Sequence, residues 1–174
     1  MTQPDGWLYR INQDNTARYV LGTVGTNPLI CVGVNPSTAT PQRLDPTVTR
    51  VAKRARDSNF DSWIMLNLYP QRSTAPEGMH SRYLPYLKAQ NEQHIAEVLQ
   101  NGRHTLLAAW GELIETRDYL PEMLHSIASI AEQSSCDWMS IGSPLKRHHP
   151  RHPSRARYDM ELQRFDMTTY LQRF

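Results

Sequence analysis

Four short apolar runs, separated by helical patterns, dominate the distribution of hydrophobic and polar residues along the chain. They cover residues 29–34, 63–67, 105–110 and 137–141. In the segments between them, apolar residues recur at intervals of three and four, as expected of amphipathic helices. Each run lies too far from the next for a hairpin, so we expect parallel pairing through helical crossovers. The pattern predicts an α/β fold, a three-layer sandwich with a central, mainly parallel four-stranded sheet.

Both ends of the chain add elements to this predicted core. Two strand-like runs at residues 7–11 and 18–21 predict a hairpin within an N-terminal extension over residues 1–25. Near the other end, apolar residues at helical spacing predict a C-terminal helix over residues 158–174. No repeat, low-complexity tract or linker divides the sequence, so we expect a single domain over residues 1–174.

The net charge is small, but the basic residues are unevenly distributed. The formal charge is +2, which excludes a protein that coats nucleic acid through its overall charge. Residues 146–157 read KRHHPRHPSRAR, with five cations and no acid. Such a focused loop indicates an anionic partner, DNA or a nucleotide, and a solvated surface loop is the alternative. The candidate phosphate-binding residues are Lys146, Arg147, Arg151, Arg155 and Arg157.

The remaining composition narrows the class of protein. Cys31 and Cys136 lie in apolar runs, which predicts buried thiols of a cytoplasmic protein rather than a disulfide. No apolar run approaches the roughly 20 residues of a membrane span, so we expect no membrane partner. Prolines separate the histidines of the basic segment, and no nearby cysteine or carboxylate completes a ligand set. We therefore expect neither a metal nor a cofactor.

Polar residues gather where the predicted parallel strands end, at the edge where open α/β sheets bind ligands. The first run ends in Gly-Val-Asn-Pro-Ser-Thr-Ala at residues 33–39, and the second continues through Asn-Leu-Tyr-Pro at residues 67–70. The third ends in Trp-Gly at residues 110–111, and the fourth leads into His-Pro-Arg-His-Pro-Ser at residues 149–154. Amides, hydroxyls and imidazoles with few carboxylates suit a neutral heterocycle and its phosphates better than a metal ion.

These motifs, in this order, resemble those of the uracil-DNA glycosylase superfamily. The Gly-x-Asn-Pro turn at Asn35 is similar to its water-activating motif, in the Asn form of the mismatch-specific branch. The strand ending in Asn67 is similar to its base-reading strand, and His-Pro-Ser at His152 to the loop that stabilises the departing base. Over roughly residues 28–155 the chain resembles more closely a bacterial and phage family known as a domain of unknown function. The shared motifs are Asn-Pro-Ser-Thr-Ala, Asp-Pro-Thr, Ala-Trp-Gly and His-Pro-Arg-His-Pro.

The superfamily resemblance implies a DNA glycosylase-like hydrolase that cleaves the N-glycosidic bond of an extruded pyrimidine base, ordinary or modified, in DNA. Asn35 would orient the attacking water, His152 would stabilise the leaving base, and Asn67 would read the base edge. Asp45 is a reserve candidate for the general base, although the following Pro46 equally suits a helix N-cap. The other candidate substrate contacts are Pro36, Ser37, Thr38, Tyr69 as a stacking side chain, Arg72, His149 as an alternative to His152, and Ser154.

The chain departs from the superfamily pattern at positions that bear on the substrate. Uracil-specific members carry Asp in place of Asn35 and an aromatic residue in place of Ser37, so the pocket would stay open to a 5-substituent. Residues 155–157, Arg-Ala-Arg, stand where the wedge leucine is expected. Two alternative functions remain: an enzyme of the same fold acting on a free nucleotide or nucleoside, and a non-catalytic nucleic-acid-binding protein.

Overall fold

A mixed sheet with helices on both of its faces forms the part of the chain that the computed structural model describes, residues 6–100 and 102–174. The strands are β1 Trp7–Ile11, β2 Arg18–Thr23, β3 Pro28–Gly33, β4 Ser62–Asn67, β5 Thr105–Ala108, β6 Asp137–Ile141 and β7 Leu162–Arg164. The α-helices are α1 Pro46–Asp57, α2 Pro85–Leu99, α3 Leu120–Gln133 and α4 Met167–Leu171. Short 3₁₀ helices are η1 Pro76–Gly78, η2 Gly111–Thr116 and η3 Pro153–Arg155.

The central strands of the sheet are parallel and its outer strands are antiparallel. Within the described residues the sheet has seven strands in the order β1-β2-β4-β3-β5-β6-β7. Parallel pairs join β3 to β4, β3 to β5 and β5 to β6, whereas β2 and β7 run antiparallel to β4 and β6. The α/β class predicted from the sequence is therefore confirmed. The expected four-stranded sheet is too small, because the N-terminal hairpin and a C-terminal strand extend it on both sides.

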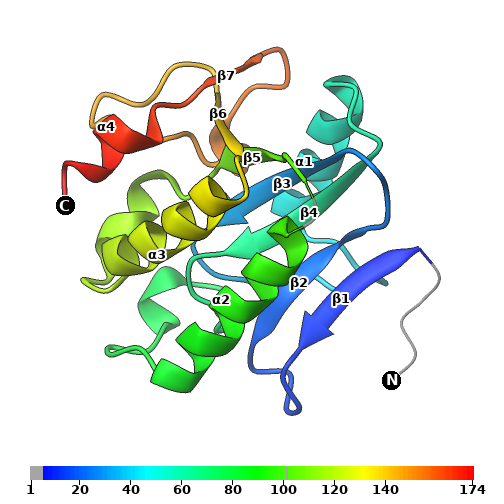
Figure 1. Cartoon of the computed structure of the whole chain (residues 1–174). Helices are drawn as coiled ribbons and strands as arrows, with labels where there is room; N and C mark the ends of the chain where they lie inside the picture. Colours follow the sequence, from blue (N-terminus) through cyan, green and yellow to red (C-terminus); the bar gives the residue numbers. More distant parts are fainter. Residues whose placement is uncertain (1–5, 101) are drawn as a thin grey trace.

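Two apolar layers bury the sheet. Figure 1 shows α2 and α3 in front of it, where Leu87 and Ile127 join one hydrophobic cluster. On the other face α1 contributes Val48 and Val51 to a second cluster. Every residue of β3 and β4 is buried. Strands covered on both faces read as continuous apolar runs, which explains why the sequence pattern identifies them.

The two chain ends differ in how well the sequence predicts them. The hairpin is present as β1 and β2, and residues 1–5 of the expected extension lie outside the described residues. The helix expected over residues 158–174 is wrong, because β7 pairs with β6 there and only the short α4 follows. Tyr158, Leu162 and Phe165, whose helical spacing led to this expectation, do not share a helix: Tyr158 is exposed, Leu162 lies in β7, and Phe165 packs against the buried Trp110 ring. None of the described helices is long and apolar enough to cross a bilayer.

The antiparallel pairing of β2 with β4 has a consequence for the polar edge of the sheet. It brings the first residue of β2, Arg18, to the edge where the parallel strands end. The Arg18 backbone N–H donates to the carbonyl oxygen of Pro70, just beyond β4, at 2.9 Å. In the parallel pair of β3 and β4, Gly33 and Asn67 lie side by side, so both strand exits reach the same point.

Candidate active site

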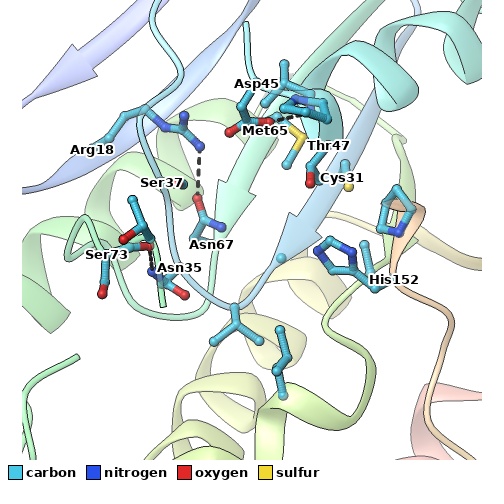
Figure 2. A pocket seen from close by; sticks show the side chains of 18 residues that line it. Arg18, Cys31, Asn35, Ser37, Asp45, Thr47, Met65, Asn67, Ser73 and His152 are labelled. Atoms are coloured by element: carbon cyan, nitrogen blue, oxygen red, sulfur yellow. Dashed lines mark hydrogen bonds between the residues drawn. The ribbon is translucent and has the colours of Figure 1, made fainter. Parts of the chain in front are cut away.

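A pocket of about 300 Å³ lies at the carboxyl edge of the parallel strands (Figure 2). Its polar lining consists of Arg18, Asn35, Ser37, Asp45, Thr47, Asn67, Ser73, Thr74 and His152. Binding sites for small molecules range from about 300 to 1,000 Å³, so this pocket suits a single heterocycle better than a dinucleotide. The structure therefore brings together Asn35, Asn67 and His152. These are the residues for which the sequence analysis predicts water activation, base reading and leaving-group stabilisation.

Asn35, directly beyond β3, is anchored through its amide nitrogen. Nδ2 donates to the carbonyl oxygens of Pro36 and Ser73, each at 3.0 Å. Oδ1 accepts no hydrogen bond from any residue that the structure describes. Figure 2 shows Asn35 beside Ser73, with His152 on the opposite side of the pocket. The side chain therefore presents a fixed acceptor, which can hold a water molecule but has little basicity.

Asp45 serves as a helix cap at the rim of the same pocket. Its Oδ1 accepts a hydrogen bond from the backbone N–H of Val48 at 2.9 Å, and Pro46 occupies the first turn of α1. This is the N-cap interpretation that the sequence left open. Asp45 also lines the pocket, so a carboxylate stands within the site whichever of its oxygens caps the helix.

Capping by Asp45 leads to a prediction about stability. We expect Asp45→Ala to lower the free energy of unfolding by about 1 kcal/mol, because the N–H of Val48 loses its acceptor. Asp45→Asn should stay close to wild type, since asparagine caps about as well as aspartate. Urea denaturation of both variants measures the difference. Equal losses in the two variants would contradict the capping role.

Asn67 is the last residue of β4 and is buried, with partners for its side-chain oxygen and its backbone carbonyl. Its side chain is 2% exposed, and its Oδ1 accepts from Nη2 of Arg18 at 3.3 Å. Its backbone carbonyl accepts from Nδ2 of Asn91 at 2.9 Å, so the buried amide of α2 fixes the end of the strand rather than facing the pocket. Asn67 Nδ2 makes no hydrogen bond to the described part of the chain. The base-reading candidate thus offers a donor.

Arg18 is the pocket residue that the sequence analysis missed. It is 2% exposed, and burial lowers the pKa of its guanidinium to about 10, with a further contribution from the charge of Arg72. It is therefore a buried cation at neutral pH. The signal in the sequence is a charged residue at the head of an apolar strand. Its place beside Asn67 depends on the pairing of β2 with β4, which the strand pattern alone does not give.

His152 presents a donor to the pocket. Its Nδ1 accepts from the backbone N–H of Ser154 at 3.3 Å and lies 2.7 Å from the Ser154 hydroxyl. Burial lowers the pKa of the imidazole, the charge of Arg155 lowers it further, and Asp45 opposes both. A backbone N–H can only donate, so the proton of the neutral ring is on Nε2. Nε2 has no hydrogen-bond partner among residues 6–100 and 102–174.

Several predicted contacts lie outside the pocket or serve the fold. The stacking role expected of Tyr69 is wrong: the residue is fully buried, and its hydroxyl lies 2.9 Å from Nδ1 of His80 and accepts from the Leu84 N–H at 3.0 Å. His149 is also fully buried, 2.7 Å from the Tyr170 hydroxyl and 3.0 Å from a Glu115 oxygen. Of the two candidate histidines, His152 lines the pocket and His149 does not.

The loop after β3 is held in place by Arg72. Its guanidinium donates to the carbonyl oxygens of Ser37 and Ala39 and to the hydroxyl of Tyr9, at 2.6, 3.3 and 2.8 Å. These bonds engage Arg72 within the chain, which does not support the phosphate contact expected for it. Ser37 lines the pocket, Thr38 lines only an adjoining hollow, and Pro36 is buried. Ser154 is exposed and supports the ring of His152.

The basic segment 146–157 carries fewer unpaired cations than its sequence indicates. Arg147 pairs with Glu115 at 2.6 Å, Arg157 pairs with Asp159, and Arg151 donates to the carbonyl of Ser143 at 3.2 Å. Side chains in this segment that form no hydrogen bond or ion pair with a described residue include those of Lys146 and Arg155.

Helix α1 adds cations beside this segment. The guanidinium carbon of Arg50 lies 4.9 Å, and the ammonium nitrogen of Lys53 5.1 Å, from the centroid of the exposed Tyr158 ring. α1 also packs against η3, which begins directly after His152. Lys53 pairs with Asp57 on the same helix, whereas Arg50 forms no ion pair with a described residue. Arg50 is therefore the α1 side chain that adds positive charge beside the segment 146–157.

The two cysteines are free thiols. Cys31 is buried and lines the pocket, and burial raises its thiol pKa far above the usual value, so it forms an apolar wall rather than a nucleophile. Cys136 is half-buried, which corrects the expectation that both thiols are buried. Within the described ranges, no group of three His, Cys, Asp or Glu side chains is placed to hold a metal ion.

The fold and the site define an α/β protein with a polar pocket at the carboxyl edge of its parallel strands. Comparison with known proteins identifies its family. The family model described as "Protein of unknown function (DUF1643)" matches residues 18–154. The match covers most of the chain, and the chain belongs to this family. It runs from Arg18 to Ser154, so it includes all of the polar pocket residues. No curated protein and no solved structure matches the chain.

Proposed function

We propose that this protein is a hydrolase that cleaves the N-glycosidic bond of a base extruded from DNA. The observation that carries the proposal is one pocket holding a water-orienting acceptor at Asn35, a base-edge donor at Asn67 and a leaving-group donor at His152. The volume of about 300 Å³ fits one base. The motif order supports the same proposal, because it resembles that of the uracil-DNA glycosylase superfamily.

In this reaction the oxygen of a water molecule bonds to C1′ of the sugar as the C1′–N bond breaks. The bonding electron pair leaves with the base, and the attacking water gives up its proton to solvent. Oδ1 of Asn35 orients the water, and Nε2–H of His152 donates to the negative charge that develops on the base. A fixed donor of this kind is typically worth about 10²–10³ in rate. Most of the acceleration then comes from stabilising the base anion, since an amide is a weak base.

The position of the pocket requires the base to leave the stack. Asn67 and Arg18 are almost completely buried, so a base can reach them only after extrusion. Phosphates on either side of the extruded nucleotide would contact Lys146, Arg155 and the half-buried Arg50 of α1. Because Arg147 and Arg157 are paired within the chain, we expect two or three phosphate contacts rather than five.

The experiment that tests the function measures abasic sites. A panel of duplexes with deaminated, mismatched and 5-modified bases is incubated with the protein, and strand scission at abasic sites is quantified. We expect scission for at least one base. If none of the duplexes in the panel is cut, the proposal is overturned, and a non-catalytic nucleic-acid-binding protein is favoured.

The salt dependence of binding distinguishes DNA from a free nucleotide, which is the second candidate ligand. With two or three phosphates neutralised, affinity for DNA should fall by about 10- to 50-fold between 50 and 200 mM salt. A mononucleotide site should lose only a few-fold over the same range. Paired cations in the basic segment are the observation that keeps this second candidate open, because a small anion needs fewer contacts. Fluorescence anisotropy with a labelled duplex measures the slope.

A further inference from the structure

The hydrogen bond between Arg18 and Asn67 fixes which atom of the Asn67 amide faces the pocket. A guanidinium group carries donors only, so the amide atom directed at it must be the oxygen. Nδ2 then points away from Arg18, and Figure 2 shows it turned into the pocket. A side chain at Gly33 would place its Cβ 3.1 Å from this nitrogen, so glycine leaves room for it. The pocket therefore receives a donor from Asn67.

Arg18 has little freedom to release Asn67. It is 2% exposed, its Nη1 donates to the carbonyl oxygen of Ala39 at 3.3 Å, and it forms no ion pair with a described residue. If the Asn67 amide turned over, its NH₂ group would meet the N–H groups of Arg18, and Nη2 of Arg18 would lose its acceptor. Leaving one buried donor unsatisfied costs about 1–3 kcal/mol. The amide is therefore held in one orientation.

The orientation determines what the pocket can read. We propose that Arg18 is a positioning residue that makes Asn67 a donor only, so the pocket accepts bases with a carbonyl at this point of their edge and rejects bases with an amino group there. This inference rests on the proposed function. Oδ1 of Asn67 points toward Arg18 and not into the pocket (Figure 2), so this amide does not read a ring N–H next to the carbonyl. The Asn67 amide therefore distinguishes a base with a carbonyl at this position from one with an amino group, but it does not distinguish among bases that carry a carbonyl there.

The rejection of an amino group has a definite physical origin. An amino group in the pocket would face the N–H of Asn67, so two donors would meet and neither would find an acceptor. Sites built around buried polar groups discriminate strongly when a partner is missing, because the unpaired groups stay desolvated. A selection of this kind depends on the fixed amide, and an amide free to turn would lose much of it.

Matched pairs of bases test the inference. Uracil and cytosine differ in a carbonyl against an amino group at one ring position, and so do hypoxanthine and adenine. We measure binding of the free bases by NMR titration, together with single-turnover cleavage of duplexes that contain each base. Wild type should prefer the carbonyl member of both pairs. Arg18→Met should reduce that preference about tenfold or more, because the Asn67 amide is then free to present its oxygen.

Two further variants complete the design. Arg18→Lys should keep the preference, since an ammonium group still donates to Oδ1 of Asn67. Arg10→Met is the matched control, because Arg10 lies on the same hairpin but pairs with Glu97, away from the pocket. It should behave as wild type. Thermal unfolding shows whether each variant is folded, and the wild-type preference in the two pairs tests the inference without any variant.

The outcomes separate this inference from the function on which it rests. If folded Arg18→Met keeps the wild-type preference, or if wild type favours the amino base in either pair, the inference fails while the hydrolase function stands. If wild type neither binds nor cleaves any of the bases, the proposed function and the inference fail together. A preference for the carbonyl member that Arg18→Met removes and Arg18→Lys retains supports both.

Discussion

Replacing His152 with alanine is expected to lower the rate of base release by about 10²–10³ while affinity for the duplex stays near wild type. The reason is that Nε2–H meets negative charge only when the base departs, so its contribution appears in the transition state and not in binding. A pocket-facing Nε2–H is assigned because Nδ1 accepts from the Ser154 N–H. Single-turnover cleavage gives the rate, and anisotropy gives the affinity.

Two replacements of His152 separate catalysis from local structure. Asparagine can place an acceptor where Nδ1 lies, so His152→Asn keeps the bond from Ser154 but lacks the distal donor; it should be as slow as the alanine variant. Glutamine reaches further and can offer an N–H near the position of Nε2, so His152→Gln should recover part of the rate. A rate within a few-fold of wild type for His152→Ala would refute the leaving-group role.

The centre of this fold can be predicted well from the sequence, because strands that are buried on both faces consist of continuous apolar runs. β3 and β4 are covered on both faces, and their runs are visible without any alignment. Parallel strands end at one edge, so the convergence of Asn35, Asn67 and His152 follows once the strands are recognised. By contrast, β7 has three residues and is largely exposed, and such a strand leaves no alternating signal strong enough to compete with a helical spacing.

The errors in the site have a different cause, since they depend on contacts between distant parts of the chain. Arg18 enters the pocket through the pairing of β2 with β4, 49 residues away from Asn67 in sequence. Tyr69 stands among polar neighbours in the sequence, but its hydroxyl binds His80 and Leu84 and its ring packs against Tyr119. Local polarity therefore indicates where a loop lies better than it indicates which way a side chain points.

The second large effect is expected at Asn35. Asn35→Ala should lower the rate of base release by about 10², the lower end of what a positioned proton-transfer group contributes, because the attacking water loses its acceptor. Some stability is lost as well, since Nδ2 no longer bonds the carbonyls of Pro36 and Ser73. The rate is therefore compared at a temperature where urea denaturation shows both proteins to be fully folded. An unchanged rate would remove Asn35 from the mechanism.

Asn35→Asp tests why an amide occupies this position. Aspartate is the stronger base, yet one of its oxygens would replace Nδ2 and face the carbonyl oxygens of Pro36 and Ser73, which need a donor. We expect a loss of about 1–3 kcal/mol in the free energy of unfolding at neutral pH and no gain in rate. Protonation restores a donor, so the pKa of the introduced carboxyl should be raised in the folded state. Its destabilising effect should then be small near pH 4 and grow as the pH rises to 7, which urea denaturation across that range measures. A variant that is faster than wild type and equally stable would show that the two carbonyls do not dictate the amide, and that a carboxylate can take its place.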